Sequence, residues 1–253
     1  MIKKFLGRKP KEIKTFKTPE GQAAYVIGDI HGCFEAMKDL LGNIDDHAQI
    51  HAQNGYLLVF LGDLMDRGPQ SKDVIEFCMT YTRPNVDIVF LKGNHEEVFL
   101  KVLEDGDADR LGAWFQFGGK KCLSSYGVDN FGEIHMNPES LLNRAQSMVP
   151  KSHIKFIQSF KDYHLFGDYL FVHAGIRPGR DLKDQKPKDM RWIRDSFLNY
   201  KKPHPYKVVH GHSIVEKAED YGNRIAVDTG GYNGGPLTAV FLKDETTEFI
   251  TSH

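Results

Sequence analysis

Five short clusters of acidic, histidine and asparagine side chains in this sequence are suited to binding divalent metal ions. The clusters are GDIHG (28–32), GDLMDRG (62–68), GNHE (93–96), FVHAG (171–175) and HGHS (210–213). Four of them follow a run of apolar residues that has the length of a β-strand. The fifth, FVHAG, includes the last two residues of such a run. In open α/β sheets, ligands bind at the carboxyl ends of the strands. We therefore expect the five clusters to meet at one edge of a sheet.

The candidate metal ligands in these clusters are Asp29, His31, Asp63, Asn94, His173 and His212. Asp29 and His31 are two residues apart, so their side chains would point the same way if the backbone stays extended there. Carboxylate, imidazole and amide-oxygen ligands without a thiolate suit manganese, iron or zinc. They fit an open hydrolytic centre better than a closed structural zinc site.

Each of these features has a simpler structural explanation when it is considered alone. His173 alone would be a hydrogen-bonded core histidine, and Asp66 with Arg67 would be a surface ion pair of little energetic value. Asn94 after a glycine is typical of a turn. Glycines also precede three of the candidate ligands, where the chain turns off a strand or approaches a ligand closely. The occurrence of all five clusters in order at strand ends favours the metal site.

The apolar runs that would position these clusters predict an α/β layered fold. Helical spacing appears between the first three runs, in Phe34, Met37, Leu40 and Leu41 and again in Val74 and Phe77. Strands that alternate with helices are typical of layered α/β domains. The predicted strands span residues 23–27, 56–61, 86–91, 169–172, 206–209, 224–227 and 237–242.

The chain has the length and apolar content of one domain. It has 253 residues, of which 40% are hydrophobic, enough to bury one sizeable core. We expect a basic tail over residues 1–20 and a single domain over residues 21–253. Residues from about 96 to 161 lack strand-like runs and predict a helical insertion that caps the core, with Pro150 between two of its helices.

The composition of the chain limits the classes of binding partner and the cellular compartments that we expect. The sequence has 33 Lys and Arg against 34 Asp and Glu, a formal net charge of -1. Such a balance gives no field that would attract nucleic acid or a membrane. Three cysteines without a CxxC spacing, and no apolar stretch of membrane-spanning length, favour a reducing cytoplasm. The sequence does not predict an oligomeric state.

The motifs GDIHG, GDxxDRG and GNHE, followed by a strand-end histidine and GH[ST], resemble the phosphoprotein phosphatase branch of the calcineurin-like metallophosphoesterases. The resemblance spans about residues 25–240. It implies a four-layer α-β-β-α metallophosphatase sandwich of two mixed β-sheets, with the metals at one edge. It also implies two divalent metal ions, one held by Asp29 and His31, the other by Asn94, His173 and His212, and both bridged by Asp63.

The resemblance assigns further roles around the metals. Arg67 and Arg194 would hold phosphate oxygens, the latter in a Trp-x-Arg segment where Arg191 is a weaker candidate. His95 would protonate the leaving group, and Asp66 would hold that histidine in place. His210 competes with His212 as a ligand, but the family's ligand is the histidine that follows a glycine. Asn94 would also face the substrate. Tyr232 in GGYNGG could reach a phosphate or a base, or it could equally be a hairpin-turn residue.

The implied reaction is the hydrolysis of phosphate monoesters by a metal-bound hydroxide. Manganese is the favoured metal, with iron or zinc as alternatives, and a serine/threonine phosphoprotein is the favoured substrate over a phosphorylated small molecule. A symmetrical bis(5'-nucleosyl)-tetraphosphatase is the alternative, and Trp114, Phe115 and Phe117 could stack on its base, although such aromatic residues are more often core. A non-catalytic metal-binding scaffold is a third hypothesis. The lack of a basic stripe disfavours a nuclease.

Overall fold

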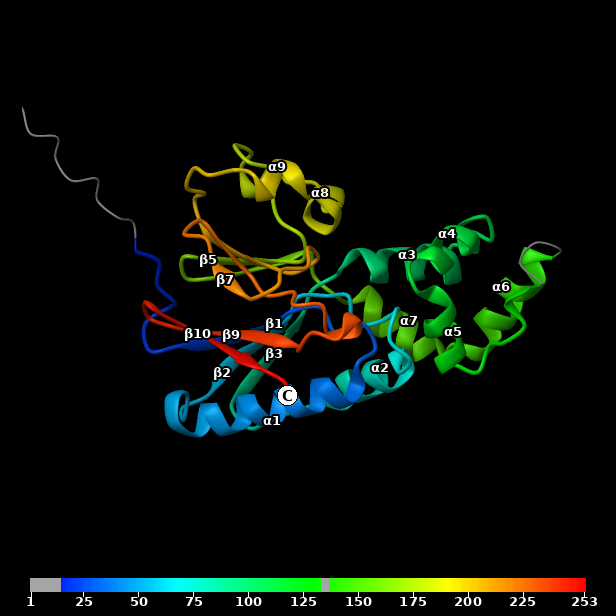
Figure 1. Cartoon of the computed structure of the whole chain (residues 1–253), viewed down its shortest axis with the longest axis horizontal. Coiled ribbons are helices and arrows are strands. Elements are labelled where there is room, and N and C mark those ends of the chain that lie inside the picture. Colours follow the sequence, from blue (N-terminus) through cyan, green and yellow to red (C-terminus); the bar gives the residue numbers. More distant parts are fainter. Residues whose placement is uncertain (1–14, 133–136) are drawn as a thin grey trace, which may run out of the picture.

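The computed structural model describes residues 15–132 and 137–253. Two five-stranded sheets face each other, and helices flank them on both sides (Figure 1). The predicted basic tail lies outside the described residues as far as residue 14. Phe16 is already buried in the core between the sheets, so packing onto the domain begins before residue 21.

Both sheets contain parallel and antiparallel neighbours. The first sheet has the order β10-β9-β1-β2-β3, with β1 (Ala23–Ile27), β2 (Tyr56–Phe60), β3 (Val86–Phe90), β9 (Thr238–Lys243) and β10 (Thr246–Thr251). Its strands β1, β2 and β3 are parallel. The second sheet has the order β4-β5-β6-β8-β7, with β4 (Tyr163–Phe166), β5 (Tyr169–Val172), β6 (Lys207–His210), β7 (Glu219–Asp220) and β8 (Arg224–Ala226). Its strands β5, β6 and β8 are parallel.

Helices cover the outer faces of the sheets and form the insertion. The first sheet packs on α1 (Phe34–His51) and α2 (Ser71–Thr80), and the second on α8 (Pro187–Trp192) and α9 (Asp195–Leu198). The insertion contains α3 (Asn94–Leu103), α4 (Arg110–Gln116), α5 (Gly119–Ser125), α6 (Pro138–Met148) and α7 (Lys151–Gln158). Among the described residues, η2 (Leu182–Asp184) and η3 (Gly231–Asn233) are 3-10 turns.

Alternating side chains along the strands separate the four layers. Ala24 and Val26 of β1 pack in the core between the sheets, together with Phe171 of β5. Tyr25 and Ile27, on the opposite face of β1, pack in the core that contains α1 and α2, as the period of two along a strand requires. A third apolar cluster joins the second sheet to α8 and α9. The predicted four-layer sandwich of two mixed sheets is confirmed.

The helical insertion shares its core with the first sheet. Trp114, Cys122 and Leu141 belong to the same buried cluster as Met37 of α1. Pro150 precedes α7 directly and separates it from α6, as predicted. The helical region begins at Asn94, slightly earlier than the predicted start near residue 96. Figure 1 shows the insertion extending sideways from the sandwich.

Three strands were not predicted, and all three lie at sheet edges. They are β4, β7 and β10. Edge strands are often short or polar, which limits pairing with other chains. In β4 and β10 most side chains are not buried, and β7 has only two residues, both exposed. Such segments lack the continuous apolar run that identifies a central strand.

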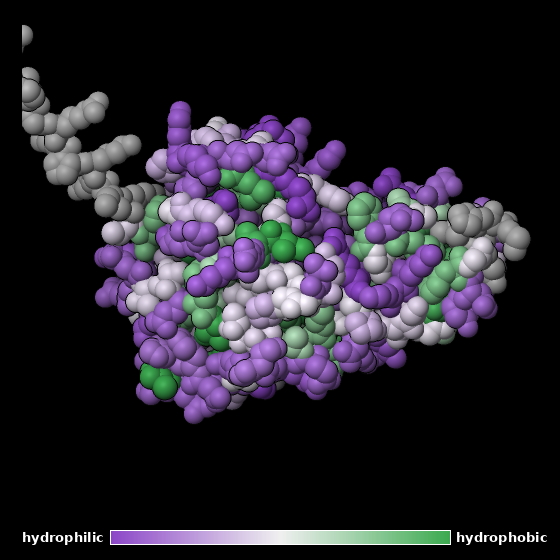
Figure 2. Space-filling view, viewed as in Figure 1, coloured by the Kyte–Doolittle hydropathy of each residue, from purple (hydrophilic) through white to green (hydrophobic). Residues whose placement is uncertain are grey.

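The face of the molecule shown in Figure 2 is mainly hydrophilic. Figure 2 shows apolar side chains in small, separate patches on one face, which is ordinary for a folded domain. Among the residues that the structure describes, none of the helices combines the length and apolar character needed to cross a bilayer. All three cysteines are free thiols, two of them buried.

Candidate metal centre and active site

The predicted site residues gather at the carboxyl ends of the parallel strands in both sheets. Several of them adopt left-handed backbone conformations that are uncommon outside glycine: His31 (φ 49°), Asp63 (51°), Asp66 (69°), Arg67 (63°) and His212 (63°). Such conformations concentrate at functional sites, where the surrounding structure holds them in place. The turns that follow the strands therefore aim these side chains into the site.

Asp63 lies at the centre of the cluster. Its Oδ2 is 3.7 Å from His31 Nε2, 3.8 Å from His95 Nε2 and 3.4 Å from His173 Nε2. Gly62 adopts a φ of 102°, and a Cβ on Gly93 would lie 2.1 Å from Asp63 Oδ1. These two positions therefore require glycine. Burial opposes ionisation of Asp63, but the three histidines outweigh it and hold its pKa well below the ordinary value.

Three predicted ligands converge on one point beside Asp63. His173 Nε2 lies 3.0 Å from Asn94 Oδ1 and 3.2 Å from His212 Nδ1. His173 Nδ1 donates to the Leu61 carbonyl at 3.0 Å, which leaves Nε2 free to bind a metal. Such hydrogen bonds orient histidine ligands. Asp63, His173 and His212 form one group able to hold a metal ion.

A second group contains His31, Asp63 and His95. His31 Nδ1 donates to the Met65 carbonyl at 2.8 Å, so its Nε2 faces Asp63. This arrangement differs from the one expected from the Asp-x-His spacing. Strand β1 ends at Ile27 and His31 has a positive φ, so the backbone is not extended through this motif.

Asp29 lies on the side of the site that faces the second sheet. The backbone N–H of His212 donates to both of its carboxylate oxygens at 3.1 Å. Asp29 belongs to neither of the two groups that could hold a metal. Its pKa lies well above the ordinary value because of burial and because Asp228 and Asp63 repel its charge. Its role as a metal ligand stays a prediction.

The donor set fits divalent cations. Asp29, Asp63, Glu96 and Asp228 are all buried, and burial raises the pKa of three of them, with added repulsion from neighbouring carboxylates. Bound cations would offset this concentration of negative charge. His212 Nε2 is buried and has no hydrogen-bond partner among the described residues, although buried polar atoms are normally paired.

His95 is held by a buried carboxylate. Its Nδ1 donates to Asp66 Oδ2 at 2.6 Å, and Trp114 Nε1 donates to the same oxygen at 2.8 Å. Burial opposes protonation of His95, but Asp63 and Asp66 outweigh it and raise its pKa above the ordinary value. A protonated imidazole directed at the metal groups can act as a general acid.

The two predicted arginines line a cavity of about 290 Å³ beside the candidate ligands. Its walls include His31, Asp63, Arg67, Arg194, His212 and Tyr232. The Arg67 guanidinium donates to the Tyr232 hydroxyl and lies 4.5 Å from the centre of that ring. Arg194 donates to Ser213 Oγ at 3.2 Å. The cavity therefore combines metal-binding groups with two guanidinium groups that suit phosphate.

The weaker alternatives from the sequence lie elsewhere. Arg191 forms ion pairs with Asp162 and with Glu97, the latter at 3.1 Å. His210 accepts a hydrogen bond from Arg224 Nη1 at 3.1 Å. Among the residues that the structure describes, neither residue belongs to a metal-binding group or lines the cavity.

The sequence interpretation assigned no role to Glu96 or Asp228. Glu96 accepts hydrogen bonds from the backbone N–H groups of Asp63, Leu64 and Gly93, each at 2.8 Å. It therefore joins two of the predicted clusters. Asp228 lines the cavity and accepts from the Gly230 N–H at 3.0 Å. For Asp228, the available signal in the sequence was its position directly after the strand-like run 224–227.

Comparisons with known proteins agree with this fold. The asymmetrical bis(5'-nucleosyl)-tetraphosphatase PrpE of Anoxybacillus flavithermus is 27% identical over 90% of this chain and 93% of its own length. Serine/threonine-protein phosphatase 2 of Escherichia coli is 25% identical over 87% of this chain and 92% of its own. A crystal structure provisionally described as a diadenosine tetraphosphatase shares the fold, with a TM-score of 0.63, 19% identity, and coverage of 95% and 99% of the two chains.

The family match and the relatives named as phosphatases identify this chain as a metal-dependent phosphoric ester hydrolase. The chain belongs to the calcineurin-like phosphoesterase family, whose model matches residues 24–244. The resemblance inferred from the motifs is confirmed.

Proposed function

We propose that this protein hydrolyses phosphorus–oxygen bonds with the help of two divalent metal ions. Manganese is the favoured metal. The convergence of His173, Asn94, His212 and Asp63 on one point carries this proposal. Two such ions, when bound, would supply an ionised water as the nucleophile and withdraw charge from the phosphate. In this proposal Asp29 and His31 would hold one ion, Asn94, His173 and His212 would hold the second, and Asp63 would bind both.

Arg67 and Arg194 bind and orient the phosphate in this proposal. Both line the same cavity as the metal groups. Guanidinium groups bind phosphate oxygens in a bidentate manner, and their contacts strengthen as charge develops on those oxygens. Tyr232 holds Arg67 against the wall of the cavity. The amide of Asn94 has its oxygen toward the metal groups, which leaves its NH₂ available to the substrate.

His95 donates a proton to the leaving oxygen in this proposal. Asp66 accepts from Nδ1, which leaves Nε2 as the atom that delivers the proton. Asp63 and Asp66 raise the pKa of His95 above its ordinary value against the opposing effect of burial, which favours the protonated imidazole. The alkoxide that leaves from a phosphate monoester such as phosphoserine needs this proton, because it leaves poorly as an anion.

We infer that the physiological substrate is a dinucleoside polyphosphate. Support comes from similarity over 90% of the chain to relatives named as asymmetrical bis(5'-nucleosyl)-tetraphosphatases. This moves the preference away from the phosphoprotein that the motifs favoured. It also favours an asymmetrical cut over the symmetrical one considered from the sequence. A serine/threonine phosphoprotein remains a second candidate, supported by the similarity to the Escherichia coli phosphatase.

Phosphate release and nucleotide products would test this function directly. Manganese-loaded protein is incubated with diadenosine tetraphosphate and, in parallel, with a phosphoserine peptide, with Asp63→Asn as the inactive control. We expect AMP and ATP from the dinucleotide, at a higher kcat/KM than for the peptide. Two ADP would instead show the symmetrical cut, and faster peptide turnover would favour the phosphoprotein. No turnover of either substrate would favour the scaffold hypothesis.

A further inference from the structure

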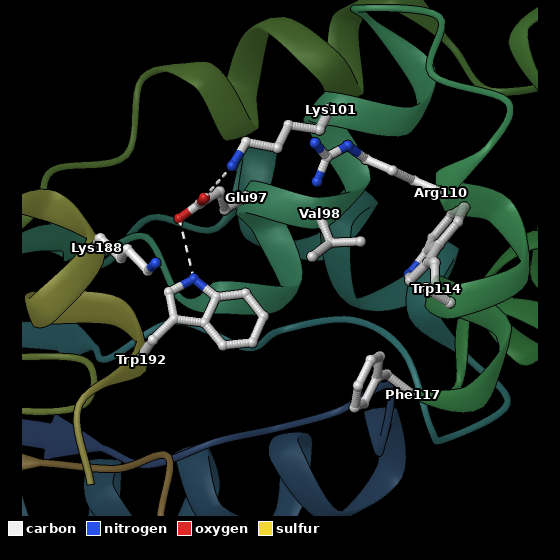
Figure 3. A pocket seen from close by; sticks show the side chains of 9 residues that line it. Glu97, Val98, Lys101, Arg110, Trp114, Phe117, Lys188 and Trp192 are labelled. Carbon is white, nitrogen blue, oxygen red and sulfur yellow. Dashed lines mark hydrogen bonds and ion pairs between the residues drawn. The ribbon is translucent and has the colours of Figure 1, made fainter.

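A second pocket lies between the insertion and the helices that cover the second sheet. It has a volume of about 540 Å³, and its lining includes Trp192 from α8, Val98 from α3 and Phe117 at the end of α4. Figure 3 shows the Trp192 and Phe117 rings on different sides of this pocket. Phe117 is 49% exposed, whereas Trp114 behind it is fully buried. Phe117 thus presents a large apolar surface that the protein core does not use.

The Trp192 ring is fixed in place before any ligand arrives. Its Nε1 donates to Glu97 Oε2 at 3.3 Å. Glu97 also pairs with Lys101 and Arg191, so its charge is compensated within the protein. An aromatic ring held in this way binds a planar partner without losing much conformational freedom.

The remaining charges around the pocket are positive. Lys188 and Arg110 line it and are exposed. Arg110 pairs with Asp107, whereas Lys188 has no ion pair within the described part of the chain. Figure 3 shows Lys188 beside Trp192, and Arg110 on the other side of Val98, near Trp114. A ligand that combines a planar ring with negative charge is complementary to this pocket.

The pocket adjoins the metal centre through Trp192. The centre of the Trp192 ring is 6.5 Å from that of His212, and His212 lines the cavity beside the candidate ligands. Arg194, two residues after Trp192, lines that same cavity. A molecule whose phosphate occupies the metal centre can therefore extend past Trp192 into the second pocket.

We propose that this pocket is a nucleoside subsite, in which a base of a dinucleoside polyphosphate stacks on Trp192 and Phe117 while Lys188 and Arg110 face the adjoining phosphates. The proposal rests on the phosphohydrolase function proposed above. Aromatic side chains stack on every base because each base has a π face. The subsite therefore selects for a nucleotide and not for one particular base.

Substrates with and without a base test this proposal. In the manganese-loaded protein, we expect Phe117→Ala to raise the KM for diadenosine tetraphosphate about tenfold, in keeping with the loss of one stacked base. We expect Lys188→Ala to raise the same KM because it removes a positive charge that faces the phosphates. Their kcat/KM for p-nitrophenyl phosphate should stay within about twofold of the parent. Phe249→Ala is the matched control, since Phe249 is 37% exposed on β10, which belongs to the first sheet.

A binding measurement separates this proposal from the proposed activity. The chain has two tryptophans, so AMP that stacks on Trp192 should quench the fluorescence of metal-free protein, and Trp192→Leu should abolish the quenching. An unchanged dinucleotide KM in both pocket variants, together with no quenching, would overturn the subsite. A KM increase confined to phosphopeptides with aromatic residues would also overturn it, in favour of a peptide site. If the parent protein turned over neither substrate but AMP still quenched its fluorescence, the proposed enzymatic function would be overturned and the subsite would stand.

Discussion

Trp114 Nε1 donates a hydrogen bond to Asp66 Oδ2 at 2.8 Å, and that same oxygen accepts from His95 at 2.6 Å. Trp114 lies in the insertion, whereas Asp66 follows β2 of the first sheet. The insertion therefore helps to orient the carboxylate that holds the proposed general acid. The other oxygen, Asp66 Oδ1, is buried without a partner in the described part of the structure.

Removal of the Trp114 donor should weaken catalysis while leaving the metals in place. Trp114→Phe keeps an aromatic ring but loses a hydrogen bond to a charged group, which costs about 1.5–3 kcal/mol. We expect a lower melting temperature and a kcat that falls several-fold more for phosphoserine peptide than for p-nitrophenyl phosphate. Phe115→Leu is the control, because Phe115 is buried nearby. Equal losses for both substrates would show a purely structural role.

His95→Asn should slow turnover with little change in metal content. General acids contribute about 10²- to 10⁴-fold to rate, and the loss should be greatest for substrates whose leaving group is an alkoxide. The measurement is kcat for a phosphoserine peptide and for p-nitrophenyl phosphate, with bound metal determined in the same samples. Full activity of the variant on the peptide would contradict the assignment of His95.

Tyr232→Phe should raise the KM by only a few-fold. The variant loses the hydrogen bond from Arg67 but keeps the ring that lies 4.5 Å from the guanidinium. Exposed cation–π contacts contribute about 0.5–1 kcal/mol. Tyr232→Ala removes both contacts, so we expect a clearly larger KM for that variant and a smaller change in kcat. Equal KM values for the two variants would rule out a positioning role for the ring.

Acid should destabilise the fold through His153. Burial lowers the pKa of this histidine, and its Nδ1 is 3.0 Å from the Tyr126 hydroxyl. The unfolded chain therefore binds a proton more readily than the folded chain does, and stability falls as pH drops below about 6.5. His153→Gln should reduce this pH dependence in urea unfolding curves measured at pH 7 and pH 5. The same substitution at His51, which is exposed, should not.

The sequence predicted the central strands because their side chains are buried. β1, β5 and β8 consist entirely of buried residues, and burial on both faces produces a continuous apolar run. The edge strands β4, β7 and β10 carry polar residues and escaped detection. The boundary of the insertion was two residues late because Asn94, a candidate ligand, is also the first residue of α3.

The candidate ligands were identifiable because motifs fix residue type and spacing at strand ends. Contacts between distant segments carry no such pattern. Trp114 lies 48 positions from Asp66, and its aromatic neighbours gave no indication of the hydrogen bond. Phe117 was grouped with Trp114 in the sequence, yet one is exposed and the other fully buried. The sequence could not assign these opposite environments, since they depend on how the insertion packs.

The candidate ligands come from both sheets. Asp29, His31, Asp63 and Asn94 follow strands of the first sheet, whereas His173 and His212 follow strands of the second. Metal ions held by all of them would act as a clamp across the sandwich, in addition to the apolar core between the sheets. Ligands that bind only the folded state stabilise it by mass action. The thermal stability of this protein would then rise with the concentration of free metal in its surroundings. Metal starvation would therefore lower both the amount of folded protein and its catalytic activity.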